Sequence, residues 1–533
     1  MEIPIKLNLG DQEQVDPLGQ KLINVIVSDN GVFLRPGSED VIDTTAGVGV
    51  TGIYDWSEQG YVVAVTEDGS VYKLTDSVIA SFSYLLLETG DKLVLEDGSG
   101  NILLETEAAI TDVTGDTLQA DTNRPTFANF GDYLYIANGS QIAELHPSQD
   151  VVSHSGTTYT ALKNSINIEP GVHADTATYW SATGTGGDAW SADVRYGSGN
   201  ADFLEDAAPT TVKFITVQDK YLFALEEGTE RVHFSVVDEP WSFDSDWFSV
   251  EEQPDDVNAI ISHNGEVWCA GVRTIQGFLD DGTTPWIPNG YGNISIGVLA
   301  PYTFIPVKGT LFFIDNNRRL VYLNGREPVS VNKTLDTYLK TISRLSTALA
   351  DFIVLGGVEF YILQFPDDGK TVAVNLDNNS WAEWTYEPTG YVKKWQANCM
   401  AYVPSWDLVM VGDAQDGWIK KVDGAYSDDD GTAISGIIRT PRMQTVGTVT
   451  VGDIAVGLTK VSETTSTGTA SFKVRWRDDG GGWKPWQTKT ISDDSKTDFV
   501  KHVRRCGSYR HNRQYEFDIS DLWPYAIQKV EQL

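Results

Sequence analysis

Alternating apolar and polar positions recur along the chain in a unit of two strands joined by a turn. Each unit has an alternating apolar strand, a turn with Gly or Asp, a second strand rich in aromatic residues, and then polar residues. The unit appears at least six times, in residues 52–74, 125–145, 212–235, 257–278, 302–323 and, more loosely, 397–422. Because side chains of a strand point alternately to its two faces, this pattern predicts repeated β-hairpins.

The turns give the length of the repeat. The step from Asp219 to Gly265 is 46 residues and the step from Gly265 to Gly309 is 44, and the regions around Phe360 and Trp406 continue at a similar spacing. This is the length of a four-stranded blade of a β-propeller. We therefore predict an all-β protein whose residues 1–435 form a propeller of six or seven blades.

Two early steps are longer than one repeat, which predicts inserted segments. The step from Gly60 to Gly131 is 71 residues, and the step from Gly131 to Asp219 is 88. The first insertion, about residues 82–120, has short strand-like runs with Gly turns and predicts an extra β-hairpin that projects from the ring. The second insertion, about residues 148–209, is rich in Gly, Ser, Thr and Ala.

Part of the second insertion resembles the small chitinase-type carbohydrate-binding module. The residues that carry the resemblance are Val152, Gly156, Tyr159, Ala161, Pro170 and Trp180, over about thirty-five residues, and the upstream aromatic residue of that family is missing. The resemblance implies glycan binding by stacking of a sugar on an exposed ring, with Tyr159, Tyr179 and Trp180 as the candidates. In the other interpretation, these rings form the small core of an inserted β module.

One segment departs from the β pattern. Residues 332–352 place Leu335, Leu339, Ile342, Leu345 and Leu349 at helical spacing. Asn332 precedes them as a candidate N-cap, and Asp336 lies in the first turns, where an acidic group is favourable. The spacing predicts an amphipathic helix that lies against the β-ring.

From about Gly436 the composition changes, and we expect a second β domain in residues 436–533. It contains a basic cluster within an acidic chain: residues 496–513 hold six Lys or Arg and one Asp. Such a cluster can dock an acidic protein partner, touch phosphates, or form salt bridges between subunits. We expect protein docking, and the candidate residues are Lys501, Arg504, Arg505, Arg510 and Arg513.

The overall charge limits the partners of the chain. Its 533 residues include 75 acidic and 39 basic side chains, a formal net charge of −36. A protein that wraps nucleic acid neutralises phosphates with Lys and Arg, which this chain cannot do over a broad surface. The N-terminus lacks the pattern of a secretory signal and no apolar run is long enough to span a membrane, so we expect a soluble protein, without membrane insertion, made in a cytoplasm. The three cysteines predict buried free thiols.

Signatures of catalysis are missing from the sequence. It has no nucleophile elbow, no Walker-type loop, no HExxH and no EF-hand loop, and we predict no catalytic residue, metal site or cofactor. A propeller glycoside hydrolase is the enzyme alternative, because a ring can present paired carboxylates at its mouth. The acidic residues considered for that role are Asp244, Asp246, Glu251, Glu252, Asp255 and Asp256. His146, His154 and His173 lie in or beside the second insertion without the spacing of metal ligands.

The arrangement resembles the tail nozzle proteins of short-tailed bacteriophages, also called packaged-DNA stabilisation proteins and related to the tail tubular protein B group. The resemblance rests on the N-terminal strand pair with its Arg-Pro-Gly turn, on the helix-bearing segment, and on two stretches near the C-terminus. These are residues 3–10 and 20–41, 328–342, 474–491 and 504–521.

The resemblance implies a structural virion protein. Members of this family form a homo-hexameric ring below the portal and the head-to-tail adaptor, extend the DNA channel, and retain the genome until ejection. The expected partners are further copies of the chain, the adaptor, tail fibres or tailspikes, and double-stranded DNA that passes without specific binding. A glycan-binding or receptor-binding propeller of a phage tail is the alternative, and a propeller glycoside hydrolase is a more distant one.

Overall fold

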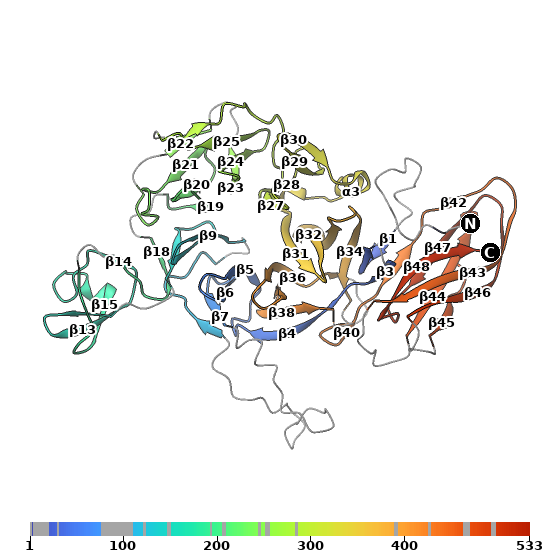
Figure 1. Ribbon diagram of the computed structural model, residues 1–533, viewed down its shortest axis with the longest axis horizontal. Coiled ribbons are helices and arrows are strands. Elements are labelled where there is room, and N and C mark those ends of the chain that lie inside the picture. Colours follow the sequence, from blue (N-terminus) through green and yellow to red (C-terminus); the bar gives the residue numbers. More distant parts are fainter. Residues whose placement is uncertain are drawn as a thin grey trace, which may run out of the picture. The chain divides into compact units, whose positions relative to one another are not determined.

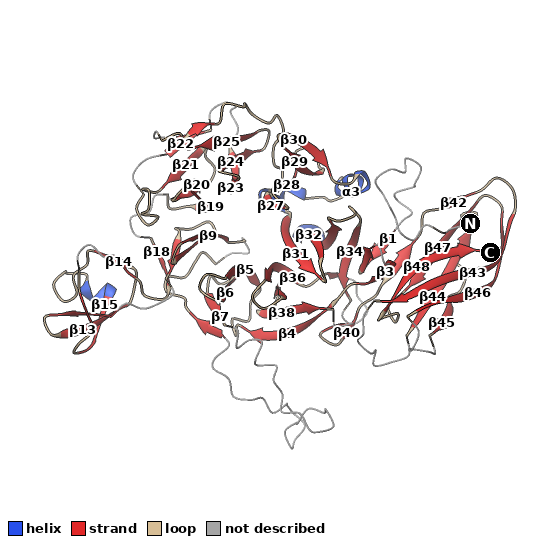
Figure 2. Cartoon of the chain, in the orientation of Figure 1, coloured by secondary structure: helices blue, strands red, loops and turns tan. Residues whose placement is uncertain are grey.

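The computed structural model describes most of the chain as β structure in two compact units (Figure 1). The described residues are Ile3 and residues 21–28, 31–75, 110–120, 124–146, 151–191, 195–204, 209–243, 247–250, 256–282, 286–387, 393–424, 428–461, 470–491 and 497–533. Unit 1 is made of residues 1–40, 307–396 and 421–533, and unit 2 of residues 41–306 and 397–420. Strands dominate both units and helices are few and short (Figure 2), which confirms the all-β prediction.

Unit 2 contains four successive antiparallel sheets of four strands each. Their strands are β5 (Val50–Trp56), β6 (Tyr61–Thr66), β7 (Val71–Leu74) and β8 (Ile110–Asp112); β9 (Thr126–Phe130), β10 (Tyr133–Ala137), β11 (Ala143–Leu145) and β18 (Ala201–Phe203); β19 (Val212–Gln218), β20 (Tyr221–Glu226), β21 (Arg231–Phe234) and β22 (Trp247–Ser249); and β23 (Val257–His263), β24 (Glu266–Gly271), β25 (Ile275–Leu279) and β26 (Ile287–Pro288). The fourth strands of the first two sheets, β8 and β18, lie within the two predicted insertions, and residues 82–109 of the first insertion lie outside the described residues.

The repeat has a local cause in the turn between the first two strands. Asp219 and Lys220 both have positive φ, 47° and 67°, and Asn264 and Gly265 have φ of 54° and 80°. Two consecutive residues of positive φ make a tight hairpin turn whose twist matches that of the strands. These turn residues therefore set the hairpin register in these two repeats.

Neighbouring sheets of unit 2 bury their apolar faces against one another. Trp56 and Val63 of the first sheet share a core with Leu134 of the second. The second and third sheets share another core, which includes Tyr135 and Leu222. This face-to-face packing of successive four-stranded sheets is the arrangement of propeller blades.

Unit 1 continues the same repeat. One group of four strands is the sheet β27 (Ile305–Val307), β28 (Thr310–Ile314), β29 (Leu320–Asn324) and β30 (Glu327–Ser330). The other group is β31 (Leu349–Leu355), β32 (Val358–Phe365), β33 (Lys370–Asn375) and β34 (Trp381–Tyr386), which form one end of a larger sheet. The rings of Phe312 and Tyr361 join them, with centroids 5.6 Å apart.

The repeat occurs once more in a sheet that uses a strand from near the N-terminus. Its order is β36 (Ala397–Val403), β37 (Leu408–Asp413), β38 (Trp418–Asp423) and β4 (Gly37–Asp43), followed by the short β39 (Asp428–Asp429) and β40 (Thr432–Ala433). The described residues thus contain seven four-strand groups of this repeat, and the number of blades in the ring stays a prediction.

A β-sandwich follows in unit 1, and the N-terminal strands take part in it. One sheet extends from β34 through β1 (Lys21–Ile23), β41 (Ile437–Arg439), β47 (Asn512–Asp518), β44 (Ser471–Asp478) and β45 (Gln487–Thr490), with β35 (Lys393–Lys394) and β42 (Met443–Gln444) beside it. The other sheet is β2 (Val25–Ser28), β3 (Gly31–Leu34), β48 (Tyr525–Gln532), β43 (Val449–Lys460) and β46 (Asp498–Tyr509). Unit 1 therefore crosses the predicted boundary at residues 435/436, and that division into domains stays a prediction.

The predicted helix is present but shorter than expected. Helix α3 (Lys333–Leu339) begins after Asn332, whose Oδ1 accepts from the backbone N–H of Thr334 and Leu335, at 2.8 and 3.1 Å. After Leu339 the chain leaves the helix in tighter turns, in which Thr341 and Ile342 donate their backbone N–H groups to Tyr338 O and Leu339 O, and Ser343 then donates to Asp368. Ile342 and Leu345, which the spacing placed in the helix, are buried but lie after its end, and Leu349 begins β31. The described residues also form the short 3-10 helices η1 (Pro301–Thr303), η2 (Leu345–Thr347) and η3 (Pro366–Asp368).

The helix packs on β34, as the prediction of a helix against the β-ring requires. Tyr338 donates its hydroxyl to Glu383 Oε1 at 2.6 Å, and its ring lies 4.9 Å from that of Trp381.

Cys269, Cys399 and Cys506 are buried free thiols, as predicted. In the part of the chain that the structure describes, no helix has the length and apolar character to cross a membrane.

Candidate functional site

Strand β46 carries most of the predicted docking residues on the edge of the second sandwich sheet. It pairs on one side with β43, and the register shifts between Val451 and Asp453. At this bulge Arg505 has a φ of 65°, so Arg504 and Arg505 are both exposed although they are consecutive. An extra residue in one strand re-aims the side chains next to it, which is why two guanidinium groups reach solvent side by side here.

The turn after β46 presents a third cation. Asp479 accepts hydrogen bonds from the backbone N–H groups of Arg510, His511 and Asn512, the shortest of them 2.7 Å from His511. These donors lower the pKa of Asp479 below its ordinary value. The carboxylate therefore holds the turn while the side chain of Arg510 is exposed.

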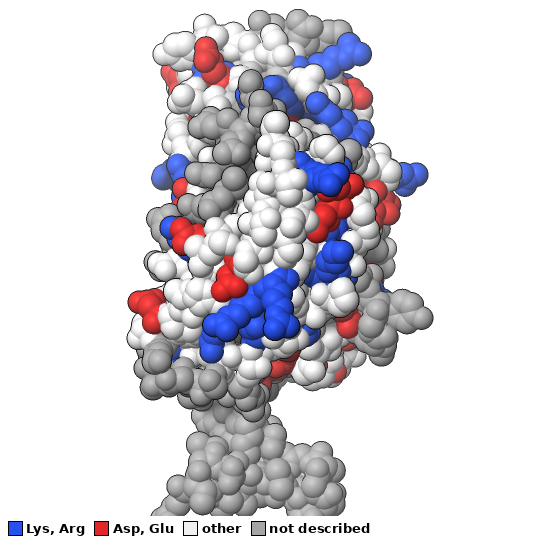
Figure 3. Space-filling view, turned by 90° about the vertical axis from the view of Figure 1, so that its right-hand side faces the viewer, with Lys and Arg blue, Asp and Glu red and all other residues white. Residues whose placement is uncertain are grey.

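Arg504, Arg505 and Arg510 are exposed, and together with Lys501 we call them the β46 surface. Lys501 is half-buried, with Nζ 5.7 Å from the ring centre of Phe499. Arg504 has 79% of its side chain exposed, and its Nε lies 3.9 Å from Asp453 Oδ2. Figure 3 shows Lys and Arg side chains gathered in patches on the side of the molecule where β46 is labelled in Figure 1.

Arg513 does not belong to this surface, and its assignment to docking is wrong. Its side chain is fully buried, Nε lies 2.6 Å from Asp478 Oδ1, and its guanidinium lies 4.7 Å from the ring centre of Tyr509. Arg513 is on β47, where it faces the interior of the sandwich. A guanidinium that is paired and covered in this way has no face left for a partner.

A second group of arginines lies on the face of the first sandwich sheet, and the sequence analysis missed it. Arg439 and Arg475 both pair with the buried Glu516, and Arg475 lies 4.3 Å from the ring centre of Trp486. Arg477 lies 4.9 Å from the ring centre of Trp483. The signal was the alternation of Lys473, Arg475 and Arg477, which places all three on one face of a strand.

The inserted module is a small β unit with its own core. It comprises β12 (Val151–His154), β13 (Thr157–Ala161), α2 (Thr176–Tyr179), β15 (Trp180–Gly184) and β16 (Asp188–Ala189), with the pair β14 (Ser165–Ile166) and β17 (Arg195–Tyr196) beside them.

The three predicted sugar-stacking residues lie in or against this core. Tyr179 and Trp180 are 7% and 3% exposed, and Tyr159 packs partly buried against them. Trp180 also donates its indole N–H to the backbone O of Ile168 at 2.8 Å. Stacking on an exposed face of Trp180 is therefore corrected, because that ring has no open face; the geometry supports the interpretation as the core of a small module.

Charged groups fasten the inserted module to the second blade. Arg195 donates from Nε and Nη2 to Glu144 Oε1, at 3.0 and 2.6 Å, and Tyr135 donates its hydroxyl to Glu144 Oε2 at 2.8 Å. Asp202 accepts from Ser198 Oγ at 2.5 Å, and burial raises its pKa to about 6. These residues bind the ends of the insertion to β11 and β18.

Most of the acidic candidates for catalysis lie outside the residues that the structure describes. Asp244, Asp246, Glu251, Glu252 and Asp255 lie outside the described residues, and Asp256 is exposed just before β23. His154 lies 3.3 Å from Glu169, in a pair of partly exposed side chains. Within the described ranges, no group of three or more His, Cys, Asp or Glu has the geometry to hold a metal ion.

The chain is similar to solved structures at low sequence identity. One is the "Crystal structure of RRP9 WD40 repeats", at 9% sequence identity and a TM-score of 0.34, covering 73% of this chain and 98% of that one. Another is the "Structure of U3-55K", at 10% identity and a TM-score of 0.33, covering 73% and 99%. No curated protein matches the chain.

A family model described as bacteriophage P22 Gp10, beta-propeller, matches residues 119–427, which include the inserted module and α3. The sandwich and the N-terminal strands lie outside the match, so the part of the resemblance that rests on them stays a prediction. Because the matched residues make up more than half of the chain, the protein belongs to the bacteriophage P22 Gp10 β-propeller family.

Proposed function

We propose that this protein is the tail nozzle subunit of a short-tailed bacteriophage. In this role six copies form a ring below the portal and adaptor, extend the DNA channel, retain the packaged genome and let it pass at ejection. The observation that carries the proposal is the match of residues 119–427 to a bacteriophage β-propeller family. The role is structural, with no catalytic residue or cofactor, and the protein is made in the host cytoplasm and ends in the virion tail.

The charge of the chain supports a conduit for DNA. Six copies would carry a formal charge of −216, six times the −36 of one chain. An acidic wall repels phosphates, so a duplex can slide along it without adhering. DNA is then a passing partner that is not bound specifically.

The β46 surface is the proposed docking site for an acidic neighbour. Arg504, Arg505 and Arg510 are exposed, whereas the chain as a whole is strongly acidic. Complementary charge speeds encounter and selects the partner. We assign this surface to the adaptor or to the next subunit of the ring, with tail fibres or tailspikes as further partners of the assembled tail.

The assembly test compares two triple charge reversals. The full-length protein is mixed with a portal–adaptor complex, and the product is examined by native mass spectrometry and electron microscopy. We expect the parent to give a six-membered ring on the adaptor, and Arg504→Glu, Arg505→Glu and Arg510→Glu together to abolish it.

The matched control carries Lys333→Glu, Lys340→Glu and Arg344→Glu, which make the same change in charge at exposed positions of the α3 segment. It should assemble like the parent. Normal assembly of the β46 triple variant would remove the docking assignment, and a parent that never joins an adaptor would remove the nozzle proposal.

A further inference from the structure

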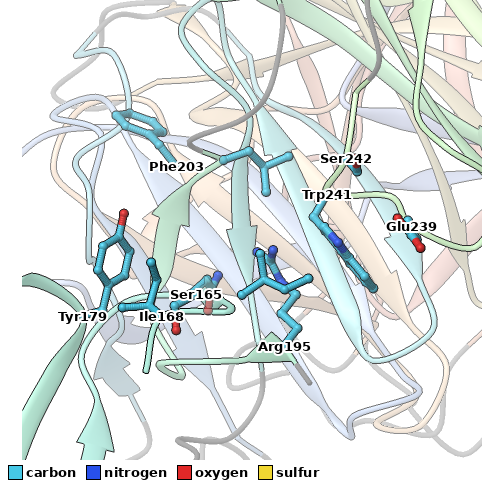
Figure 4. A pocket seen from close by; sticks show the side chains of 11 residues that line it. Ser165, Ile168, Tyr179, Arg195, Phe203, Glu239, Trp241 and Ser242 are labelled. Atoms are coloured by element: carbon cyan, nitrogen blue, oxygen red, sulfur yellow. The ribbon is translucent and has the colours of Figure 1, made fainter. Parts of the chain in front are cut away.

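A cavity of about 280 Å³ lies between the inserted module and the blades of unit 2 (Figure 4). Its lining comes from the β14–β17 pair, from α2, from β18 and from the segment that joins β21 to β22. The side chains that matter for its chemistry are Ser165, Tyr179, Arg195, Phe203, Glu239 and Trp241.

The polar floor of the cavity is held by short-range pairing. β14 and β17 are antiparallel, with Ile166 opposite Arg195 and Ser165 opposite Tyr196. The two hydrogen bonds from Arg195 to the fully buried Glu144 fix the guanidinium in place. They also neutralise its charge, so the floor offers hydrogen-bond donors without a net positive charge.

One polar group at this floor is left without a partner in the described structure. Ser165 is 4% exposed, it lines the cavity, and its Oγ makes no hydrogen bond. A buried hydroxyl without a partner costs free energy, and native proteins rarely leave one. A molecule with hydroxyl groups would satisfy it.

Aromatic rings flank this floor. In Figure 4, Tyr179 and Trp241 lie on opposite sides of the labelled set, with Ser165 and Arg195 between them. The Arg195 guanidinium lies 5.1 Å from the ring centre of Trp241, which orients that ring. The exposed Glu239 adds a negative charge to the lining, which disfavours an anionic ligand.

We propose that this cavity binds the terminal pyranose ring of a neutral glycan. A sugar ring has an apolar C–H face for Trp241 and hydroxyl groups for Ser165 and Arg195. The volume lies below the range of drug-sized pockets, which suits one ring better than a chain of several. This function goes beyond the nozzle role and does not depend on it.

The test uses the full-length protein and a panel of neutral hexoses and N-acetylhexosamines. Saturation-transfer NMR should detect at least one of these sugars, with a dissociation constant in the millimolar range, roughly −4 kcal/mol. Trp241→Leu should weaken binding by about tenfold or more, and Ser165→Ala, which removes only the hydroxyl, by about two- to tenfold.

The control is Trp247→Leu, which removes a 40% exposed indole on β22 that does not line the cavity. It should bind like the parent. Thermal unfolding of each variant shows whether it is folded, and Ser165→Ala keeps the test valid if Trp241→Leu unfolds. Absence of saturation transfer for every sugar would mean that the cavity holds only water and would overturn the proposal, as would equal losses for Trp247→Leu and Trp241→Leu. Assembly with the adaptor does not enter this measurement, so its failure and that of the nozzle proposal are separate.

Discussion

Two arginine sites of unit 1 differ in burial and in hydrogen-bond partners, the two properties that decide whether a charged side chain can contact another protein. Arg35, in the Arg-Pro-Gly turn, is 0% exposed, whereas 79% of the Arg504 side chain on the β46 surface is open to solvent. Arg35 therefore stabilises the fold, whereas Arg504 is available to a binding partner. The difference teaches that a basic residue in this acidic chain has to be assigned by its burial and by its partners, and not by its place in a motif.

Arg35 uses all of its hydrogen-bond donors inside unit 1. Its two terminal nitrogens reach Asp429 Oδ1 and Oδ2, at 3.0 and 2.5 Å, and Nε reaches Asn24 Oδ1 at 3.1 Å. The remaining N–H groups donate to the backbone O of Pro36 and Thr385. The N-terminal segment is therefore held to the blade strand β34 and to β39 through one side chain.

The largest loss in the free energy of unfolding is expected from replacing Arg35. Arg35→Met leaves the buried Asp429 carboxylate without its cation, and loss of one partner of a buried pair destabilises by about 3–5 kcal/mol. Denaturant unfolding followed by circular dichroism measures the loss. The double variant Arg35→Met with Asp429→Leu replaces both charges by apolar groups and should recover much of the stability. An unfolding free energy of Arg35→Met within about 1 kcal/mol of the parent would contradict a stabilising role for Arg35.

A second comparison sets two arginines three residues apart against each other. Arg513→Ala uncovers part of the sandwich interior and leaves Asp478 unpaired, so it should cost about 2–4 kcal/mol. Arg510→Ala changes only an exposed side chain and should stay within about 0.5 kcal/mol of the parent. Unfolding free energies of the two variants, measured side by side, check this, and equal costs would return Arg513 to the exposed surface.

The sequence predicts local features of this fold well, because their causes lie within a few residues. The hairpin turn at Asn264 and Gly265 requires positive φ at two neighbouring positions, and the cap of α3 requires only the side-chain oxygen of Asn332. The pairing of β1 with β34 joins Ile23 to Glu383, a contact that no local pattern carries.

The candidate sites show the same limit. Arg510 and Arg513 look alike in the sequence, but the turn held by Asp479 exposes one and strand β47 buries the other. Trp180 has the position of a stacking residue and the burial of a core residue. The cavity residues Arg195 and Trp241 come from separate elements, so their meeting depends on tertiary packing.

Asp202 is a buried carboxylate without a cation of its own, and its replacement should change how stability depends on pH. Burial raises its pKa to about 6, against about 4 for an unfolded chain. Between these values the folded protein binds more protons than the unfolded chain, so this group lowers the free energy of unfolding as the pH rises. Asp202→Asn should therefore gain about 1–3 kcal/mol relative to the parent between pH 4 and pH 7.

The measurement is the difference in unfolding free energy between Asp202→Asn and the parent at several pH values. Asp132→Asn, at an exposed position of the same blade, is the control and should show a flat difference. A flat difference for Asp202→Asn as well would mean that this carboxylate is solvated like a surface group.

The smallest effect on stability is expected at the β46 surface, where the comparison began. Arg504→Gln and Arg510→Gln together should change the unfolding free energy by no more than about 0.5 kcal/mol, because exposed ion pairs such as Arg504 with Asp453 contribute little. The same double variant should bind the adaptor more weakly than the parent. Added salt should also weaken adaptor binding by the parent, because salt screens exposed charges. Isothermal titration at two salt concentrations, beside denaturant unfolding, separates the two properties. A stability loss above about 1 kcal/mol with unchanged adaptor binding would mean that Arg504, like Arg35, stabilises the fold and does not dock a partner.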